Sequence, residues 1–166
     1  TSRYSIPTFA AGLIAYLEYA DRGPVHLVGN SLGGSIAVRV AALRPDLVRS
    51  LSLISPAMPF LNPRRSAQAP FVPLLALPRA DLVYAWGLGR MTVEQVADQV
   101  IRACFGDTAK VSEQRRAEAT EEIRLRYTVE HYPKAYMGTL RGLVSSFLRA
   151  YLPGANSQWR LAAVGG

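Results

Sequence analysis

The feature that most constrains the fold of this chain is a short apolar segment that ends at a glycine and continues into a serine and two more glycines. Residues 26–34 read His-Leu-Val-Gly-Asn-Ser-Leu-Gly-Gly. The apolar residues before Gly29 predict a strand. After Ser31, apolar residues recur at helical spacing, at Leu32, Ile36, Val40 and Leu43. The sequence therefore predicts that Ser31 lies on a sharp strand-to-helix turn, where a nucleophile is most exposed.

The glycines around Ser31 have a steric role in this prediction. Gly29 and Gly33 flank the serine in the spacing Gly-x-Ser-x-Gly. A residue in so tight a turn has an unfavourable backbone conformation, so we expect its neighbours to lack side chains that would clash. Gly34, which comes next, is expected to let the helix approach the strand closely.

A longer segment, residues 24–57, resembles the nucleophile elbow of the α/β-hydrolase superfamily. The likeness covers the strand, the turn, the helix, the connection Arg-Pro-Asp-Leu-Val-Arg and a second parallel strand at 51–54. It implies that Ser31 attacks a carbonyl, while a histidine takes its proton and an acid orients the histidine. It also implies that the backbone N–H of Leu32 supplies half of the oxyanion hole. The other elbow residues are Gly29, Asn30, Gly33 and Gly34.

We expect an α/β fold, in which a partial α/β-hydrolase core with a short parallel sheet around the elbow carries a mainly helical cap. Residues 1–57 form the partial core, which includes an amphipathic helix at 5–20. Residues 58–155 resemble the cap or lid of many α/β-hydrolases. Their helical patterns cover 71–77, 80–88, 92–104, about 112–131 and 134–151. Residues 156–166 are expected to begin the return to the core.

Neither histidine of the chain is a convincing base for Ser31. His26 precedes the serine by five residues on the same strand, which places it about 16 Å away at ~3.3 Å per residue. His131 is expected near the end of a cap helix, in a surface or capping role. In the family the acid and the histidine follow strands downstream of the cap. The resemblance therefore implies that this chain is the middle of a larger enzyme and has little or no activity alone.

Three functions stay open on the sequence. The first is a serine hydrolase acting through Ser31 on an ester or related carbonyl of a small molecule. The Gly-Asn-Ser elbow also resembles that of carbon–carbon bond hydrolases, so this substrate class is included. The second is a cofactor-free perhydrolase or haloperoxidase-like enzyme of the same superfamily. The third is a truncated or degenerate member that serves as a binding or interaction domain.

Composition excludes several other classes. The net charge of +7 does not indicate a nucleic-acid site, because the arginines of 113–126 share their segment with an equal number of glutamates, which is typical of a solvated helix face. No apolar run is long enough to span a membrane. The single Cys104 is expected to be a buried thiol in a reducing, cytoplasmic compartment. No cofactor or metal is expected, and the oligomeric state is left open.

Overall fold

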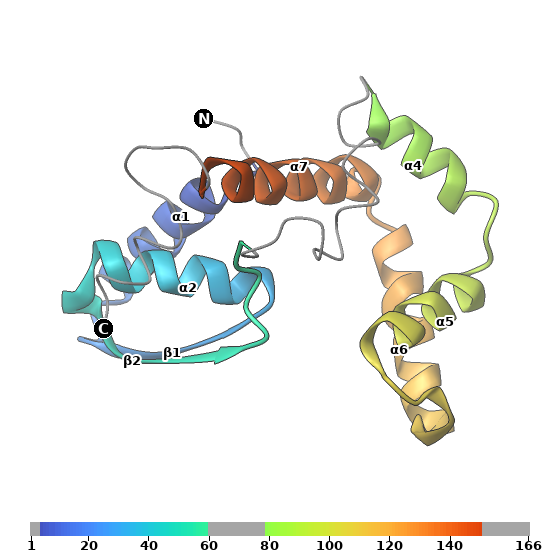
Figure 1. The fold of residues 1–166 in the computed structure, drawn as a ribbon, viewed down its shortest axis with the longest axis horizontal. Coiled ribbons are helices and arrows are strands. Elements are labelled where there is room, and N and C mark those ends of the chain that lie inside the picture. Colours follow the sequence, from blue (N-terminus) through green and yellow to red (C-terminus); the bar gives the residue numbers. More distant parts are fainter. Residues whose placement is uncertain (1–3, 60–78, 151–166) are drawn as a thin grey trace. The chain divides into compact units, whose positions relative to one another are not determined.

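The computed structural model describes residues 4–59 and 79–150, which form two compact units (Figure 1). The first unit combines residues 4–59 with 138–150, and the second contains residues 79–137. The expected helix at 71–77 and the expected return to the core at 156–166 lie outside the described residues. Each unit is described by itself below.

The first unit contains the predicted strand–helix–strand segment. Helix α1 (Ile6–Ala20) precedes strand β1 (Val25–Asn30), helix α2 (Leu32–Leu43), a 3-10 turn η1 (Pro45–Leu47) and strand β2 (Val48–Ile54). α1 begins after Ser5, whose hydroxyl accepts a hydrogen bond from the N–H of Thr8. β2 is three residues longer at its start than the sequence pattern predicted.

The two strands pair in parallel, with Leu27 opposite Leu51 and Asn30 opposite Ile54. α2 packs against both strands and against α1. In Figure 1 α2 runs along one face of the two-stranded sheet. Because parallel strands end at the same edge, the residues after Asn30 and after Ile54 lie next to each other. This edge carries the predicted elbow.

The core of the first unit extends to the last helix. Helix α7 (Tyr132–Ala150) contributes Leu143 and Phe147, which are buried against Ile6 of α1. Leu32, Ile36 and Ala57 pack on the same cluster. The residues that follow Ser31 in α2 therefore pack directly against an apolar core to which α1 and α7 also contribute.

The second unit is helical in its described part. It contains α4 (Ala80–Leu88), α5 (Val93–Cys104), a 3-10 turn η4 (Thr108–Lys110), α6 (Glu113–Tyr127) and the beginning of α7. α5 and α6 pack through a small core. Its buried members are Val96, Ala97 and Ile123.

Two expectations for this unit need correction. The predicted helix at about 112–131 ends at Tyr127, and α7 already begins at Tyr132 because Pro133 is tolerated in a first helical turn. His131 therefore lies in the turn before α7 and not in a helix, and its carbonyl accepts the N–H of Ala135 at 3.0 Å. Cys104 is exposed, since it ends α5 on the outer side of the helix.

The second compact unit does not coincide with the expected cap. The cap was expected to cover residues 58–155, whereas residues 138–150 pack with the first unit. The assignment of a cap therefore stays a prediction.

Candidate active site

Ser31 occupies the turn between β1 and α2, as the sequence predicted. Its backbone dihedrals are φ 49° and ψ −119°, and its side chain makes no capping hydrogen bond to α2. Positive φ is rare for a residue with a Cβ and costs energy, so such residues are concentrated at functional sites. The residue is exposed. The turn thus presents the Ser31 hydroxyl at the surface of its unit.

Hydrogen bonds from the second strand hold Ser31 in this conformation. The N–H of Ser31 donates to the carbonyl of Ile54 at 3.0 Å, and the carbonyl of Ser31 accepts the N–H of Ala57 at 2.8 Å. The hydroxyl of Ser35 donates to the carbonyl of Ala57. Sequence reasoning assigned no role to Ala57. Its position just after a parallel strand, at the same sheet edge as Ser31, was the available signal.

The glycines differ in what they do. A Cβ at Gly29 would lie 2.7 Å from the Gly33 carbonyl oxygen, and a Cβ at Gly34 would lie 2.7 Å from Cβ of Pro56. Both positions therefore require glycine, because the obstructing atoms belong to the backbone or to a rigid ring. The steric reason predicted for Gly33 is wrong, since a Cβ there would meet nothing within 4 Å.

The remaining elbow residues fit their expected places. Leu32 opens α2, so its N–H is among the first-turn amides that have no acceptor within the helix. Asn30 ends β1 and is exposed. An amide at the start of a helix also carries the positive end of the helix dipole, which suits it to a developing oxyanion.

The histidines have other surroundings. Nδ1 of His26 lies 2.6 Å from Oγ of Ser50 on the neighbouring strand, near the start of β1 and therefore at the opposite end from Ser31. His131 belongs to the second unit. Within the described part of the first unit, the structure thus brings no histidine to the elbow.

The aspartates of the described ranges have local roles. Arg44 hydrogen-bonds Asp46 and holds the pKa of that carboxyl below its usual range. Asp98 pairs with Arg102 at 2.7 Å and with Arg116 at 3.5 Å. Asp21 caps the end of α1, Asp81 lies in the first turn of α4, and Asp107 caps the start of η4.

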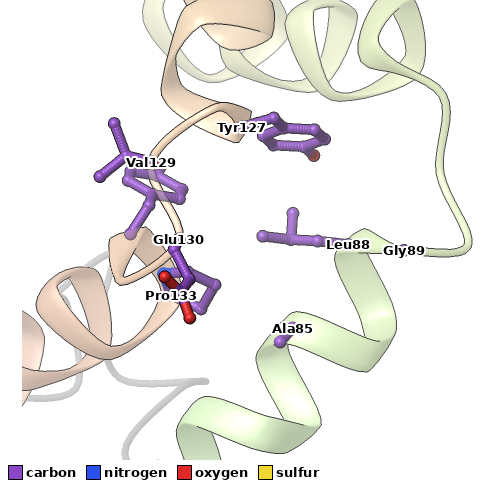
Figure 2. A pocket seen from close by; sticks show the side chains of 8 residues that line it. Ala85, Leu88, Gly89, Tyr127, Val129, Glu130 and Pro133 are labelled. Carbon is purple, nitrogen blue, oxygen red and sulfur yellow. The ribbon is translucent and has the colours of Figure 1, made fainter.

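The second unit has a cavity of its own, of about 230 Å³, between α4 and the segment that joins α6 to α7 (Figure 2). Its lining is mostly apolar and aromatic, and includes Leu88, Tyr127, Val129 and Tyr132. Tyr84 and Tyr136 stack nearby at a ring separation of 5.0 Å. Burial raises the pKa of both hydroxyls. An apolar group of a small molecule fits such a lining.

Two further features bear on the site. Across residues 4–59 and 79–150, no three His, Cys, Asp or Glu side chains come close enough to hold a metal ion together. Over the same ranges, no helix combines the length and the apolar character that crossing a membrane requires.

A parallel sheet in which one strand ends at an exposed, positive-φ serine and continues into a helix has the geometry that is typical of a nucleophile elbow in α/β proteins. The sequence matches the alpha/beta hydrolase family over residues 1–161. The chain therefore belongs to the alpha/beta hydrolase family.

Similar proteins share shorter stretches. Lipase LipV of Mycobacterium tuberculosis is 42% identical over 55 residues, which are 33% of this chain and 21% of LipV. The dihydrolipoyllysine-residue acetyltransferase component of the acetoin cleaving system of Pseudomonas putida is 44% identical over 45 residues, or 27% of this chain and 12% of that protein. The chain thus matches only a small part of the length of either relative.

A solved structure supports the fold. The crystal structure of lip1, a proposed lipase from Acinetobacter baumannii AYE, superposes with a TM-score of 0.57 and 22% identity. The superposition covers 97% of this chain and 47% of that one. The resemblance to α/β-hydrolases stated from the sequence is confirmed, and so is the fold class.

Proposed function

We propose that this chain carries the nucleophile of a serine hydrolase that acts on an ester or related carbonyl of a small molecule. The Oγ of Ser31 attacks the carbonyl carbon as a general base takes its proton, and the N–H of Leu32 stabilises the oxyanion that forms. Collapse of the oxyanion then breaks the bond to the leaving group, which takes up that proton. Substrates cleaved at a carbon–carbon bond belong to the same proposal, because the attack on the carbonyl is the same. Residues 58–155, whose described part over 79–150 is mainly helical, serve as the cap, and the single Cys104 suits a cytoplasmic protein.

The observation that carries the proposal is the backbone of Ser31, with φ 49° and ψ −119° between a strand and a helix. Nothing in the packing of the sheet requires a serine there, and glycine would adopt this conformation at lower cost. The names of LipV and lip1 as lipases support an ester substrate.

We further propose that residues 1–166 alone react slowly, because His26 is bonded to Ser50 at the far end of β1. The test is labelling with a fluorophosphonate probe, followed by peptide mapping, with and without added imidazole. We expect slow labelling at Ser31 that free imidazole accelerates, because imidazole in solution replaces the missing general base.

Two variants make the test specific. Ser31→Ala should abolish the probe adduct on the peptide that contains position 31. Ser55→Ala is the matched control, because Ser55 is also exposed and also has positive φ (43°) at the end of the neighbouring strand, and it should label as the wild type does. Equal labelling of the Ser31→Ala variant would refute the proposal.

A second candidate function is a degenerate member that binds without catalysis. The contact of His26 with Ser50 favours it, because the histidine on the strand that leads to the elbow is hydrogen-bonded to the neighbouring strand and not to Ser31. The same experiment separates the two. No adduct at Ser31, even in imidazole, would favour the binding domain over the hydrolase.

A further inference from the structure

We propose that the first unit contains a binding site for a phosphate-bearing small molecule, between the start of α1 and the C-terminal half of α7. A cavity of about 420 Å³ lies there, within the size range of small-molecule sites. Arg141 and Arg149 line it together with serines of both helical segments. The site is independent of the chemistry proposed for Ser31.

The spacing of the residues on α7 explains how the cavity acquires its polar wall. Arg141, Ser145 and Arg149 follow one another at intervals of four residues, so they share one stripe of the helix. Leu143 and Phe147, also four apart, face the apolar core. The helix therefore buries one side in the core and turns a stripe of two guanidinium groups and a hydroxyl toward the cavity.

The opposite wall is the start of α1, which approaches α7 closely. A Cβ at Gly138 would lie 2.5 Å from the Tyr4 ring, and a Cβ at Gly142 would collide with the Tyr4 carbonyl. These two glycines let the chain entering α1 lie against α7, as Figure 1 shows. Ser5 and Pro7 then line the cavity from that side.

The charge of the site has one sign. Among the residues that the structure describes, no acid lines the cavity, and α7 contains none over Tyr132–Ala150. The single acid of α1, Glu18, lies near the other end of that helix, where it pairs with Arg44. The positive end of the α1 dipole adds to the two guanidinium groups.

These features select the ligand class. Guanidinium groups bind planar and tetrahedral oxyanions through paired N–H donors, and two of them together with the Ser145 hydroxyl suit a group with two negative charges, while the hydroxyl of Ser146 donates to the Gly142 carbonyl. A phosphate group meets this demand, whereas a carboxylate carries half the charge. The volume beyond the phosphate group leaves room for a small organic part.

The experiment is isothermal titration of the whole chain with inorganic phosphate at constant ionic strength, with acetate as the comparison anion. We expect saturable binding of phosphate and much weaker binding of acetate. Arg149→Gln, an exposed position at the end of α7, should weaken phosphate binding about tenfold, as the loss of a charged hydrogen-bond donor predicts. Arg141→Gln provides a second measurement of the same kind.

Lys134→Gln is the matched control, because Lys134 lies exposed on the same helix, carries the same charge and does not line the cavity. It should leave phosphate binding unchanged, and so should Ser31→Ala. The proposal is overturned if the wild type shows no saturable binding or if acetate binds as well as phosphate. Equal weakening by Lys134→Gln and Arg149→Gln would also overturn it, because the effect would then be one of net charge.

Discussion

At the scale of single residues, the elbow is a strained conformation that its neighbours stabilise. A backbone in a sparsely populated region costs about 1–3 kcal/mol. At Ser31 this cost is offset by hydrogen bonds to Ile54, the last residue of β2, and to Ala57, three residues further along the chain. The position of Ser31 therefore depends on the second strand as much as on β1, which leads into it.

The strain at Ser31 predicts that glycine is more stable there than alanine. Ser31→Gly and Ser31→Ala both remove the hydroxyl, so their difference isolates the effect of the backbone. We expect the glycine variant to be more stable by about 1 kcal/mol, because glycine reaches φ 49° without a clash but also has a more flexible unfolded chain. Urea unfolding of the two variants measures this difference. An alanine variant as stable as the glycine variant would contradict the strain.

Two adjacent glycines of α2 provide a matched pair. Gly34→Ala should destabilise the protein by about 1–3 kcal/mol, because the new Cβ meets Pro56 at 2.7 Å and the ring has no free space to move into. Gly33→Ala should be neutral or stabilising by up to about 1 kcal/mol, since its Cβ meets nothing and alanine favours helix. Thermal unfolding of both variants measures the two changes in stability. A similar loss of stability in both would show that the contact with Pro56 does not matter.

At the scale of elements, local signals predicted most helix starts but not all ends. The predicted 80–88 and 92–104 match α4 and α5 closely, with a glycine at the end of α4 and a capping box at the start of α5 as local signals. The break between α6 and α7 was expected at 132–133 and lies at 128–131, because Pro133, which marks it in the sequence, is accommodated in the first turn of α7. Likewise, Gly138 and Gly142 have a clear role only once Tyr4 is placed against them.

The start of α5 carries a capping box formed by Thr92 and Gln95. The hydroxyl of Thr92 accepts the N–H of Gln95 at 3.2 Å, and the Gln95 side chain accepts the N–H of Thr92 at 2.9 Å. Thr92→Ala should cost about 1 kcal/mol in the free energy of unfolding, whereas Thr92→Ser, which keeps the hydroxyl, should cost much less. Amide hydrogen exchange in the first turn of α5 would report the same order. Unchanged exchange in the alanine variant would contradict the role of the cap.

The turn between α2 and β2 has a pH-dependent contact. Arg44 lowers the pKa of Asp46 chiefly through a hydrogen bond, so the contact stabilises the fold above the ordinary aspartate pKa of about 3.9 and is lost as the pH falls through the lowered value. In Arg44→Gln the pKa of Asp46, followed by NMR, should return to its ordinary range. Arg49→Gln, which removes the same charge from an exposed position on β2, should leave it lowered. An unchanged titration in Arg44→Gln would refute the assignment.

At the scale of the whole molecule, the sheet of the first unit is covered on one side only within the described ranges. α2 packs on the face that contains Leu27 and Leu51. The opposite face bears Val28 and Ile54, which are 70% and 56% exposed. Apolar side chains on an open two-stranded sheet, with unpaired strand edges among the described residues, favour association with another sheet.

This exposed face predicts concentration-dependent self-association of residues 1–166. Val28→Lys should reduce it, because a charge on an open strand opposes the approach of a second sheet. The change should alter the free energy of unfolding by less than about 0.5 kcal/mol, since Val28 is 70% exposed. Light scattering over a range of protein concentrations measures the association. Leu43→Lys, at a 48% exposed position at the end of α2, is the control and should associate as the wild type does. A wild type that stays monomeric at all concentrations would contradict this reading of the sheet, and equal loss of association in both variants would assign the effect to net charge instead of to the face of β1.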